Sequence, residues 1–220
     1  MASPSPARLR AFVRRHTRLV PVPELFGLRL HLADDVMGLL QATADELGES
    51  DPDLPYWAFA WPGGLALVRF LADHPQEVAG RRVLDMASGS GLCAISAMRL
   101  GAASVQAVDT DPFAEAAIDL NARANGVRVG FSRQDLLGAA PPSCDVILAG
   151  DVCYAEAMAG RMLAWLAEAA DRGTRVLVGD PGRRYLPADL QRLATYTVRA
   201  SREIEDGEVK RAGVFTLLGR

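Results

Sequence analysis

The chain has 220 residues, half of them hydrophobic, which is enough apolar material for one domain with a buried core. A formal net charge of −3, from 27 acidic and 24 basic residues, argues against a general nucleic-acid-binding protein, which usually carries a basic face. The three cysteines show no CxxC spacing, and the longest uncharged apolar stretch, 54–68, is interrupted by Pro62, Gly63 and Gly64. These features disfavour a disulfide framework, a zinc site and a membrane span, and they favour a reducing cytoplasm.

The N-terminal region is rich in arginine, and five arginines precede its first acidic residue, Glu24. A basic, acid-poor N-terminus is a property of organelle transit peptides. Serine is scarce, however, and Leu9, Phe12 and Val13 are spaced as on one face of a helix. We therefore expect a solvated amphipathic helix rather than a transit peptide.

Further elements are predicted before the main domain begins. Leucines alternate with polar residues over 28–32, which predicts a half-buried strand, and a capped helix is expected over 34–47. The turn-rich segment 48–55 then separates two parts. We expect residues 1–54 to be an N-terminal elaboration of helix and strand, and residues 55–220 to form the principal domain.

Strand-like and helical segments alternate from residue 82 onward, which predicts βαβ units and a parallel sheet. The expected strands are 82–86, 104–108, 127–131, 145–149 and 175–178, and the expected helices start near Leu92, Pro112, Ala155 and Pro187. Segments 196–203 and 211–218 flank Asp206-Gly207, a hairpin turn signal. The expected fold is α/β: a doubly wound seven-stranded sheet, mostly parallel, with an antiparallel C-terminal hairpin and helices on both faces.

The stretch "VLDMASGSGLCA", 83–94, forms the first strand-to-helix turn of this pattern. Gly89 and Gly91 allow a ligand to approach the backbone, and the following helix presents its amino end there. The spacing to Ala94 also fits the relaxed dinucleotide fingerprint, which alone is weak evidence. Asp85 precedes the glycines, and its carboxylate would repel a pyrophosphate but suits an ammonium or sulfonium group, as in S-adenosylmethionine.

Aspartates also follow the next two strands. Asp109 is placed to accept hydrogen bonds from ribose hydroxyls. Asp111 precedes Pro112 and is expected to be a helix N-cap. Asp135, in "RQDLL", is a candidate for the amino group of adenine, with an ordinary loop aspartate as the alternative.

The motifs "VLDMASGSG", "AVDTDP", "RQDLL" and "ILAGDVCY" resemble, in order, those of the class I, seven-stranded S-adenosylmethionine-dependent methyltransferases. The resemblance implies a Rossmann-like sheet that binds this cofactor. One departure is Ala87, where many relatives have glycine; we expect its methyl group to be sterically mild. The cofactor-binding residues implied by position and motif are Trp61, Asp85, Ala87, Gly89, Gly91, Asp109, Asp135 and Leu136.

A closer resemblance lies in the flanking motifs. "PYWAFAWPGGLAL", "GDVCY" and "VLVGDPGR" are similar to segments of the lysine methyltransferases that modify the β-subunit of electron transfer flavoprotein, bacterial relatives included. The likeness extends over about 55–183. It implies that the acceptor is a lysine of a protein substrate, with the flavoprotein β-subunit as the suspected partner, and no nucleic acid or membrane.

The candidate catalytic residues are Asp151 and Tyr154. Lysine is overwhelmingly protonated at neutral pH, and a carboxylate beside it raises the cost of deprotonation. We therefore expect Asp151 to orient the acceptor, and Tyr154 to turn its ring or hydroxyl toward the amine. The alternative makes Asp151 the N-cap of the helix near Ala155 and Tyr154 a packed aromatic residue.

Four aromatic residues precede the glycine turn. We expect Trp57 and Phe59 in the core and Trp61 beside the cofactor, at the bend formed by Pro62, Gly63 and Gly64. Around the acceptor, Tyr56, Asp180 and Arg183 are the predicted substrate rim, although Asp-Pro-Gly is equally a plain turn. The three histidines, His16, His31 and His74, show no metal-binding spacing.

Other functions share parts of this pattern. A methyltransferase of a small, nicotinamide-type amine or of a ribosomal protein would have the same cofactor half. A dinucleotide-binding oxidoreductase would use Gly89, Gly91 and Ala94, but Asp85 argues against it. A binding module without activity would be expected to lose Asp151 and Tyr154, and the sequence retains both.

Overall fold

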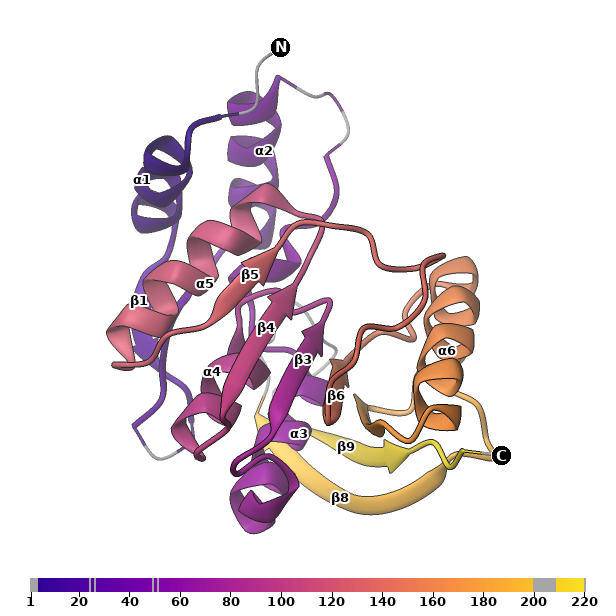
Figure 1. Ribbon diagram of the computed structural model, residues 1–220. Coiled ribbons are helices and arrows are strands. Elements are labelled where there is room, and N and C mark those ends of the chain that lie inside the picture. The colour runs from indigo at the N-terminus through magenta and orange to yellow at the C-terminus, as the bar shows by residue number, and fades with distance from the viewer. Residues whose placement is uncertain are drawn as a thin grey trace.

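The computed structural model describes residues 4–23, 25, 27–48, 50, 52–199 and 209–219. A seven-stranded sheet runs through the molecule in the order β5-β4-β3-β6-β7-β9-β8 (Figure 1). Only the pairs β7–β9 and β8–β9 are antiparallel, which confirms the expected sheet. The strands are β3 (Arg82–Met86), β4 (Ser104–Val108), β5 (Gly130–Ser132), β6 (Val146–Gly150), β7 (Arg175–Asp180), β8 (Gln191–Arg199) and β9 (Val209–Thr216).

Alternate residues of the central strands enter two apolar clusters, one on each face of the sheet. Leu148 joins a cluster with α3, α4 and α5, whereas its neighbour Ile147 joins a cluster with α6. Successive side chains of a strand point to opposite faces of a sheet, so this alternation shows that the central strands are buried on both faces. Helices cover both faces, as expected: α3 (Pro62–Asp73), α4 (Leu92–Arg99), α5 (Pro112–Ala124) and α6 (Glu156–Asp171).

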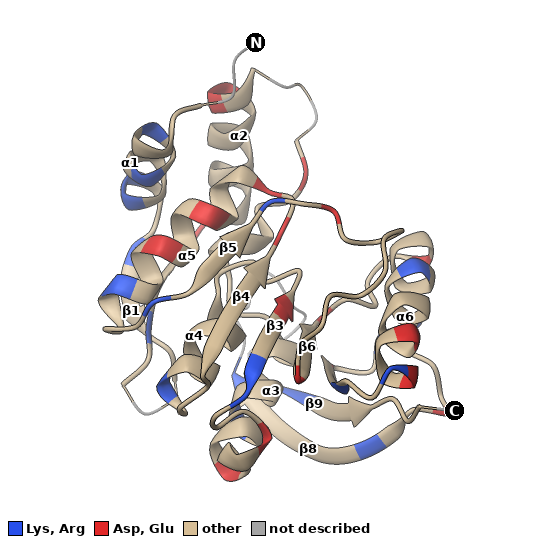
Figure 2. Cartoon of the chain, in the orientation of Figure 1, with Lys and Arg blue, Asp and Glu red and all other residues tan. Residues whose placement is uncertain are grey.

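The N-terminal region packs against α5. It contains α1 (Pro6–His16), the antiparallel pair β1 (Arg18–Pro21) and β2 (Arg29–Leu32), and α2 (Val36–Leu47). The predicted apolar face of α1 is buried, and the ring of Phe12 lies 4.7 Å from that of Phe113 between centroids. Arg8, Arg14 and Arg15 are exposed, and the arginines of α1 are the blue segments of that helix in Figure 2. The amphipathic helix is therefore confirmed, and the boundary between residues 54 and 55 stays a prediction.

Two expectations near proline are wrong. No helix starts at Pro187; β8 begins at Gln191 instead, because that segment pairs with β9 along its length. Residues 62–64 are the first turn of α3 rather than a bend, since proline is well suited to the first helical position. The predicted third strand, 127–131, is shorter and later, at Gly130–Ser132.

Two predictions for the C-terminal hairpin fall on residues that the structure does not describe. The turn predicted at Asp206-Gly207 and the end of the strand predicted over 196–203 fall outside the described residues. Within the described ranges, no helix combines the length and the apolar character that crossing a bilayer requires.

Candidate active site

A cavity of about 690 Å³ lies at the carboxyl ends of the strands. β3 has β4 on one side and β6 on the other, so the chain adds strands first on one side of β3 and then on its other side. Open parallel sheets bind ligands at such a switch in strand order. An acidic segment ends β3 at this edge (Figure 2). Most predicted site residues line the cavity: Tyr56, Trp61, Asp85, Ala87, Gly89, Asp109, Asp135, Leu136, Asp151, Tyr154 and Arg183.

The glycine turn is held by two aspartates of the cavity wall, the buried Asp85 and the half-buried Asp109. Asp109 accepts a hydrogen bond from the backbone N–H of Gly89 at 2.8 Å through one carboxylate oxygen, and from that of Asp111 at 3.0 Å through the other. Asp85 accepts from the backbone N–H of Ala94 at 3.0 Å and from the Ser88 hydroxyl. Both carboxylates therefore stabilise the conformation of the turn, and both also line the cavity.

Burial changes the acidity of these groups. It raises the pKa of Asp85 to about 7 and also raises the pKa of Asp109, and the charge of Asp109 adds to the shift at Asp85. Two carboxylates in a largely buried wall favour a ligand that brings positive charge or hydroxyl donors. The wall therefore fits the ammonium and ribose hydroxyl groups of S-adenosylmethionine.

Two small residues of the turn differ from expectation. Ala87 has a φ of 51°, in the left-handed region that favours glycine, so its departure from the motif strains the backbone rather than crowding a ligand. Gly91, with a φ of 77°, does not line the cavity; a Cβ there would lie 2.9 Å from Cγ1 of Ile118. The absence of a side chain at Gly91 therefore allows α5 to pack closely against the turn.

The loop after β5 lines another part of the cavity. Asp135 accepts a hydrogen bond from the backbone N–H of Leu137 at 2.9 Å and pairs with Arg161 at 3.1 Å. The hydrogen bond and then the ion pair lower the pKa of Asp135. Asp135 thus has the local contacts of a loop aspartate and also borders the cavity. Asp111 is the N-cap of α5, as predicted, and accepts from the Phe113 N–H at 2.7 Å.

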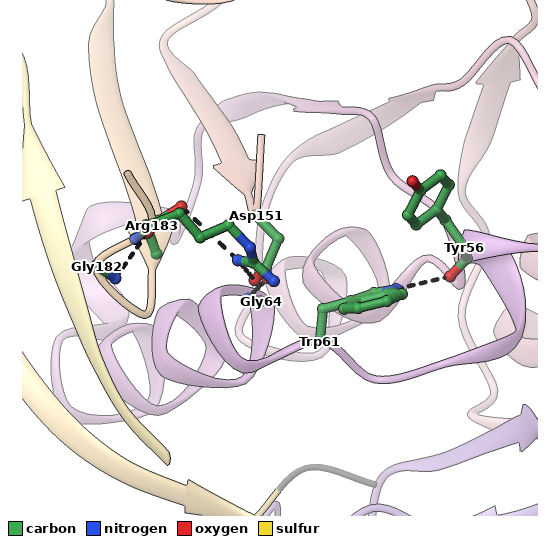
Figure 3. Close-up of polar contacts among 7 residues, drawn as sticks. Tyr56, Trp61, Gly64, Asp151, Gly182 and Arg183 are labelled. Carbon is green, nitrogen blue, oxygen red and sulfur yellow. Dashed lines mark hydrogen bonds and ion pairs between the residues drawn. The ribbon is translucent and has the colours of Figure 1, made fainter. Parts of the chain in front are cut away.

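Aromatic side chains line one part of the cavity. The indole N–H of Trp61 donates to the carbonyl of Tyr56 at 3.0 Å, which fixes the ring at the start of α3 (Figure 3). The ring of Tyr56 lies 5.5 Å from that of Trp61 and 5.2 Å from that of Tyr154 between centroids. Trp57 and Phe59 are buried in the core, as predicted.

Asp151 joins the start of α3 to the loop after β7. Its carboxylate accepts from the Gly64 N–H at 2.8 Å and forms an ion pair with Arg183 (Figure 3). Burial raises the pKa of Asp151 to about 6, while Arg183 opposes that shift. The alternative N-cap role is wrong, because the N-cap of α6 is Ala155 and no side chain caps that helix.

The predicted substrate rim is only partly accessible. Asp180 is fully buried and accepts from the N–H groups of Gly182 at 2.7 Å and Arg183 at 2.6 Å. Its expected rim position is therefore wrong, and it stabilises the Asp-Pro-Gly turn instead. Arg183 reaches inward to Asp151 and lines the cavity.

Several cavity residues were not predicted from the sequence. Asp53 and Leu54 come from the turn-rich segment before the domain, and Met158 and Met162 come from α6. The two methionines are four residues apart and hence on one helix face. This spacing can be read from the sequence and places both methionines on one helix face, but it does not show whether that face lines a cavity or packs in the core.

Comparison with known proteins agrees with the fold and the cavity. A family model for ribosomal protein L11 methyltransferase (PrmA) matches residues 69–159. Electron transfer flavoprotein beta subunit lysine methyltransferase from Xenopus laevis is 36% identical over 204 residues, covering 90% of this chain and 82% of that protein. The Rattus norvegicus enzyme is 42% identical over 151 residues, covering 66% and 59%. The Caenorhabditis elegans homologue is 33% identical over 186 residues, covering 76% and 75%.

Solved structures share the architecture. A putative RNA methyltransferase from Pyrococcus horikoshii aligns with a TM-score of 0.57 at 16% identity, over 82% of this chain and 98% of that chain. Magnesium protoporphyrin IX methyltransferase from Synechocystis, solved with S-adenosylmethionine bound, aligns with a TM-score of 0.52 at 20% identity, over 70% and 77%. At these identities the likeness concerns the fold.

The sheet order, the glycine turn and these matches define a class I S-adenosylmethionine-dependent methyltransferase. Within that class, the alignment with the Xenopus laevis enzyme identifies a narrower group. The chain belongs to the electron transfer flavoprotein beta subunit lysine methyltransferase family. The dinucleotide-binding oxidoreductase and the inactive binding module are therefore wrong.

Proposed function

We propose that this protein transfers methyl groups from S-adenosylmethionine to lysine side chains of the electron transfer flavoprotein β-subunit. The observation that carries the proposal is the 36% identity with the Xenopus laevis enzyme across 90% of this chain. That alignment is too long to reflect the cofactor-binding half alone. It supports a shared acceptor as well as a shared cofactor.

The cavity wall supports specific roles in cofactor binding. When bound, S-adenosylmethionine supplies an electrophilic methyl group on a positively charged sulfur. We assign Asp109 to the ribose hydroxyls, Asp85 to the ammonium group, and the loop residues Asp135 and Leu136 to the adenine. The ring of Trp61 is assigned to a contact with the positive charge, because aromatic faces attract cations.

The acceptor amine must lose its proton before it can attack the methyl group. That loss costs lysine roughly 4 kcal/mol at pH 7.4, and an isolated carboxylate would add to the cost. Arg183 sits on Asp151 and offsets its charge. We infer that Asp151 orients the amine by a hydrogen bond, while the guanidinium of Arg183 disfavours the protonated ammonium form.

Tyr154 supports the same geometry from the opposite wall. Its side chain is partly exposed and its ring packs on that of Tyr56, so the pair borders the route by which a long side chain reaches Asp151. We assign both tyrosines to guiding the aliphatic part of lysine. Their apolar rings suit its methylene groups, and their hydroxyls remain available for hydrogen bonds.

The test measures methyl transfer from labelled S-adenosylmethionine to the recombinant flavoprotein β-subunit, with mass spectrometry to locate the methylated residue. A β-subunit with arginine at the methylated position is the matched control. The enzyme's own lysine, Lys210, is the only one in the sequence, so the Lys210→Arg enzyme removes self-labelling. Transfer to nicotinamide or other small amines, with none to the flavoprotein, would overturn the proposal.

A ribosomal protein is the second candidate acceptor. The observation behind it is the match of residues 69–159 to the ribosomal protein L11 methyltransferase model. That range spans the glycine turn, Asp109 and Asp151 but not the loop that contains Arg183. The same assay with isolated ribosomal proteins compares the two acceptors, and we expect faster transfer to the flavoprotein.

The compartment and the remaining partners are proposals as well. We propose a reducing cytoplasm, since Cys93, Cys144 and Cys153 are all free thiols. Neither a nucleic-acid partner nor a membrane partner is expected. Fractionation of the source cells with an antibody to this protein tests the compartment, and recovery in an organelle fraction would contradict it.

A further inference from the structure

Asn121 is a fully buried polar residue on α5 that connects two distant parts of the chain. Its side-chain N–H donates to the carbonyl of Ser90 at 2.9 Å. Its side-chain oxygen accepts from the backbone N–H of His31, on β2, at 2.7 Å. Ser90 stands between Gly89 and Gly91, so one amide group joins the glycine turn to the N-terminal region.

The glycine turn is therefore held from two sides. From the cavity, Asp109 holds the N–H of Gly89. From behind, Asn121 donates to the carbonyl of the following residue, Ser90, and does not itself line the cavity. Gly91 has no room for a side chain above Ile118, which keeps the turn and α5 in close contact.

We propose that Asn121 is a positioning residue for the cofactor: through its hydrogen bond to the Ser90 carbonyl it holds the glycine turn in the conformation that binds S-adenosylmethionine. Preorganised backbone groups bind a ligand more tightly because less order is lost on binding. The proposal rests on the cofactor assignment of the class and is independent of the acceptor.

The same helix supplies a matched control. Asn125 lies one turn after Asn121 and also holds β2, accepting from the N–H of Arg29 at 3.0 Å and donating to its carbonyl at 2.6 Å. Its other hydrogen bond goes to the carbonyl of Asn121 within α5 at 2.7 Å. Asn125 therefore shares the contact with β2 but not the contact with the glycine turn.

The experiment measures the Kd of S-adenosylmethionine by calorimetry for the wild-type protein, Asn121→Ala and Asn125→Ala, with Tm recorded for each. We expect Asn121→Ala to raise Kd about 10-fold, the equivalent of one hydrogen bond, and Asn125→Ala to leave Kd within about 2-fold. Hydrogen exchange should accelerate at the amides of 88–92 in Asn121→Ala alone. Asp109→Ala serves as the positive control for weakened binding.

A second substitution guards against a variant that does not fold. Asn121→Asp keeps an oxygen acceptor for His31 and a similar shape, and at alkaline pH, where its carboxylate is ionised, it cannot donate to Ser90. We expect its Kd to rise at least as much as that of Asn121→Ala. Equal changes in Kd for the Asn121 and Asn125 variants, or unchanged Kd in either folded Asn121 variant, would overturn the proposal. A wild-type protein that binds no S-adenosylmethionine would instead refute the cofactor assignment.

Discussion

Two non-glycine residues of the described chain have a positive φ, and both border the cavity: Ala87 at 51° and Asp151 at 59°. Left-handed backbone costs an L-residue roughly 1 to 2 kcal/mol. Strain of this kind gathers at functional sites, where the surrounding structure enforces it. Ala87 supports the turn below the cofactor, and Asp151 directs its carboxylate toward Gly64 and Arg183.

Replacing Ala87 with glycine tests whether the backbone at this position is strained. We expect Ala87→Gly to raise the free energy of unfolding by about 1 kcal/mol, because glycine adopts a φ of 51° without steric cost. Chemical denaturation measures the change. Ala164→Gly, at an exposed position inside α6, is the control and should lower stability by about 1 kcal/mol. Destabilisation by both substitutions would contradict the strain at Ala87.

Asp151 should separate turnover from cofactor binding. We expect Asp151→Asn to reduce kcat at least about 100-fold, since the amide cannot replace the charged acceptor of the lysine, while Kd for S-adenosylmethionine stays within a few-fold. Single-turnover kinetics and calorimetry provide the two measurements. Arg183→Gln is the companion variant, and its effect should not add to that of Asp151→Asn, because the two residues form one ion pair. A parallel loss of binding and turnover would place Asp151 in the cofactor site.

The contact between the start of α3 and the end of β7 includes a close approach of the two backbones. Gly63 and Gly179 face each other so closely that a Cβ on either would overlap the other's carbonyl oxygen. The start of α3 therefore reaches the carboxyl end of β7, and this approach places the N–H of Gly64 beside Asp151. The glycines that resemble a flexible bend in the sequence are the residues that allow this packing.

A methyl group at this contact should be costly. We expect Gly63→Ala to lower the free energy of unfolding by roughly 1 to 3 kcal/mol, because the added carbon forces α3 away from the sheet. Gly160→Ala is the matched control: that glycine lies on the exposed side of α6 with nothing within 4 Å of an added Cβ, so stability should rise slightly. Thermal unfolding of both variants measures the difference. Equal behaviour of the two variants would argue against the backbone contact.

Local patterns predicted the bounds of several elements correctly. β3 and β4 have the bounds expected from their apolar runs, and α5 begins at Pro112 with Asp111 as its cap. The wrong helix at Pro187 has a different cause, because pairing with β9 overrides a favourable helix start. Sequence spacing alone does not contain that long-range contact.

The same division applies to the site. Asp85, Asp109 and Asp151 were predictable because each ends or follows a strand at the same edge of a parallel sheet. The inward course of Arg183 depends on its ion pair with Asp151, which lies 32 positions earlier in the chain. No local pattern encodes that approach.

The molecule as a whole buries carboxyl groups at its cavity, and this sets an unusual pH dependence. The pKa of Asp85 and of Asp111 is raised from 3.8 to about 7, and that of Asp151 to about 6, in each case chiefly by burial. Between about pH 4 and 7 these three carboxyl groups therefore bind more protons in the folded protein than in the unfolded chain. Their contribution to stability is greatest near pH 4 and is lost as the pH rises to 7.

Asp145 and Asp135 act in the opposite direction. The Arg82 side chain lowers the pKa of Asp145 to about 2, and the Leu137 N–H lowers that of Asp135, so their stabilising effect is lost as the pH falls below about 4. We expect the Tm of the protein without cofactor to decline between pH 5 and 7.5, and Asp85→Asn to flatten that decline. Calorimetric scans across this range test it; a Tm that rises toward pH 7.5 would contradict the burial effect.

The last strand of the sheet in sequence order is not at its edge. β9 lies between β7 and β8, and β8 touches the sheet only through β9. During synthesis, β8 therefore emerges from the ribosome with no sheet neighbour to receive it. The nascent chain keeps an unpaired edge at β7 until β9 has followed, so loss of β9 by truncation removes two strands from the folded enzyme rather than one.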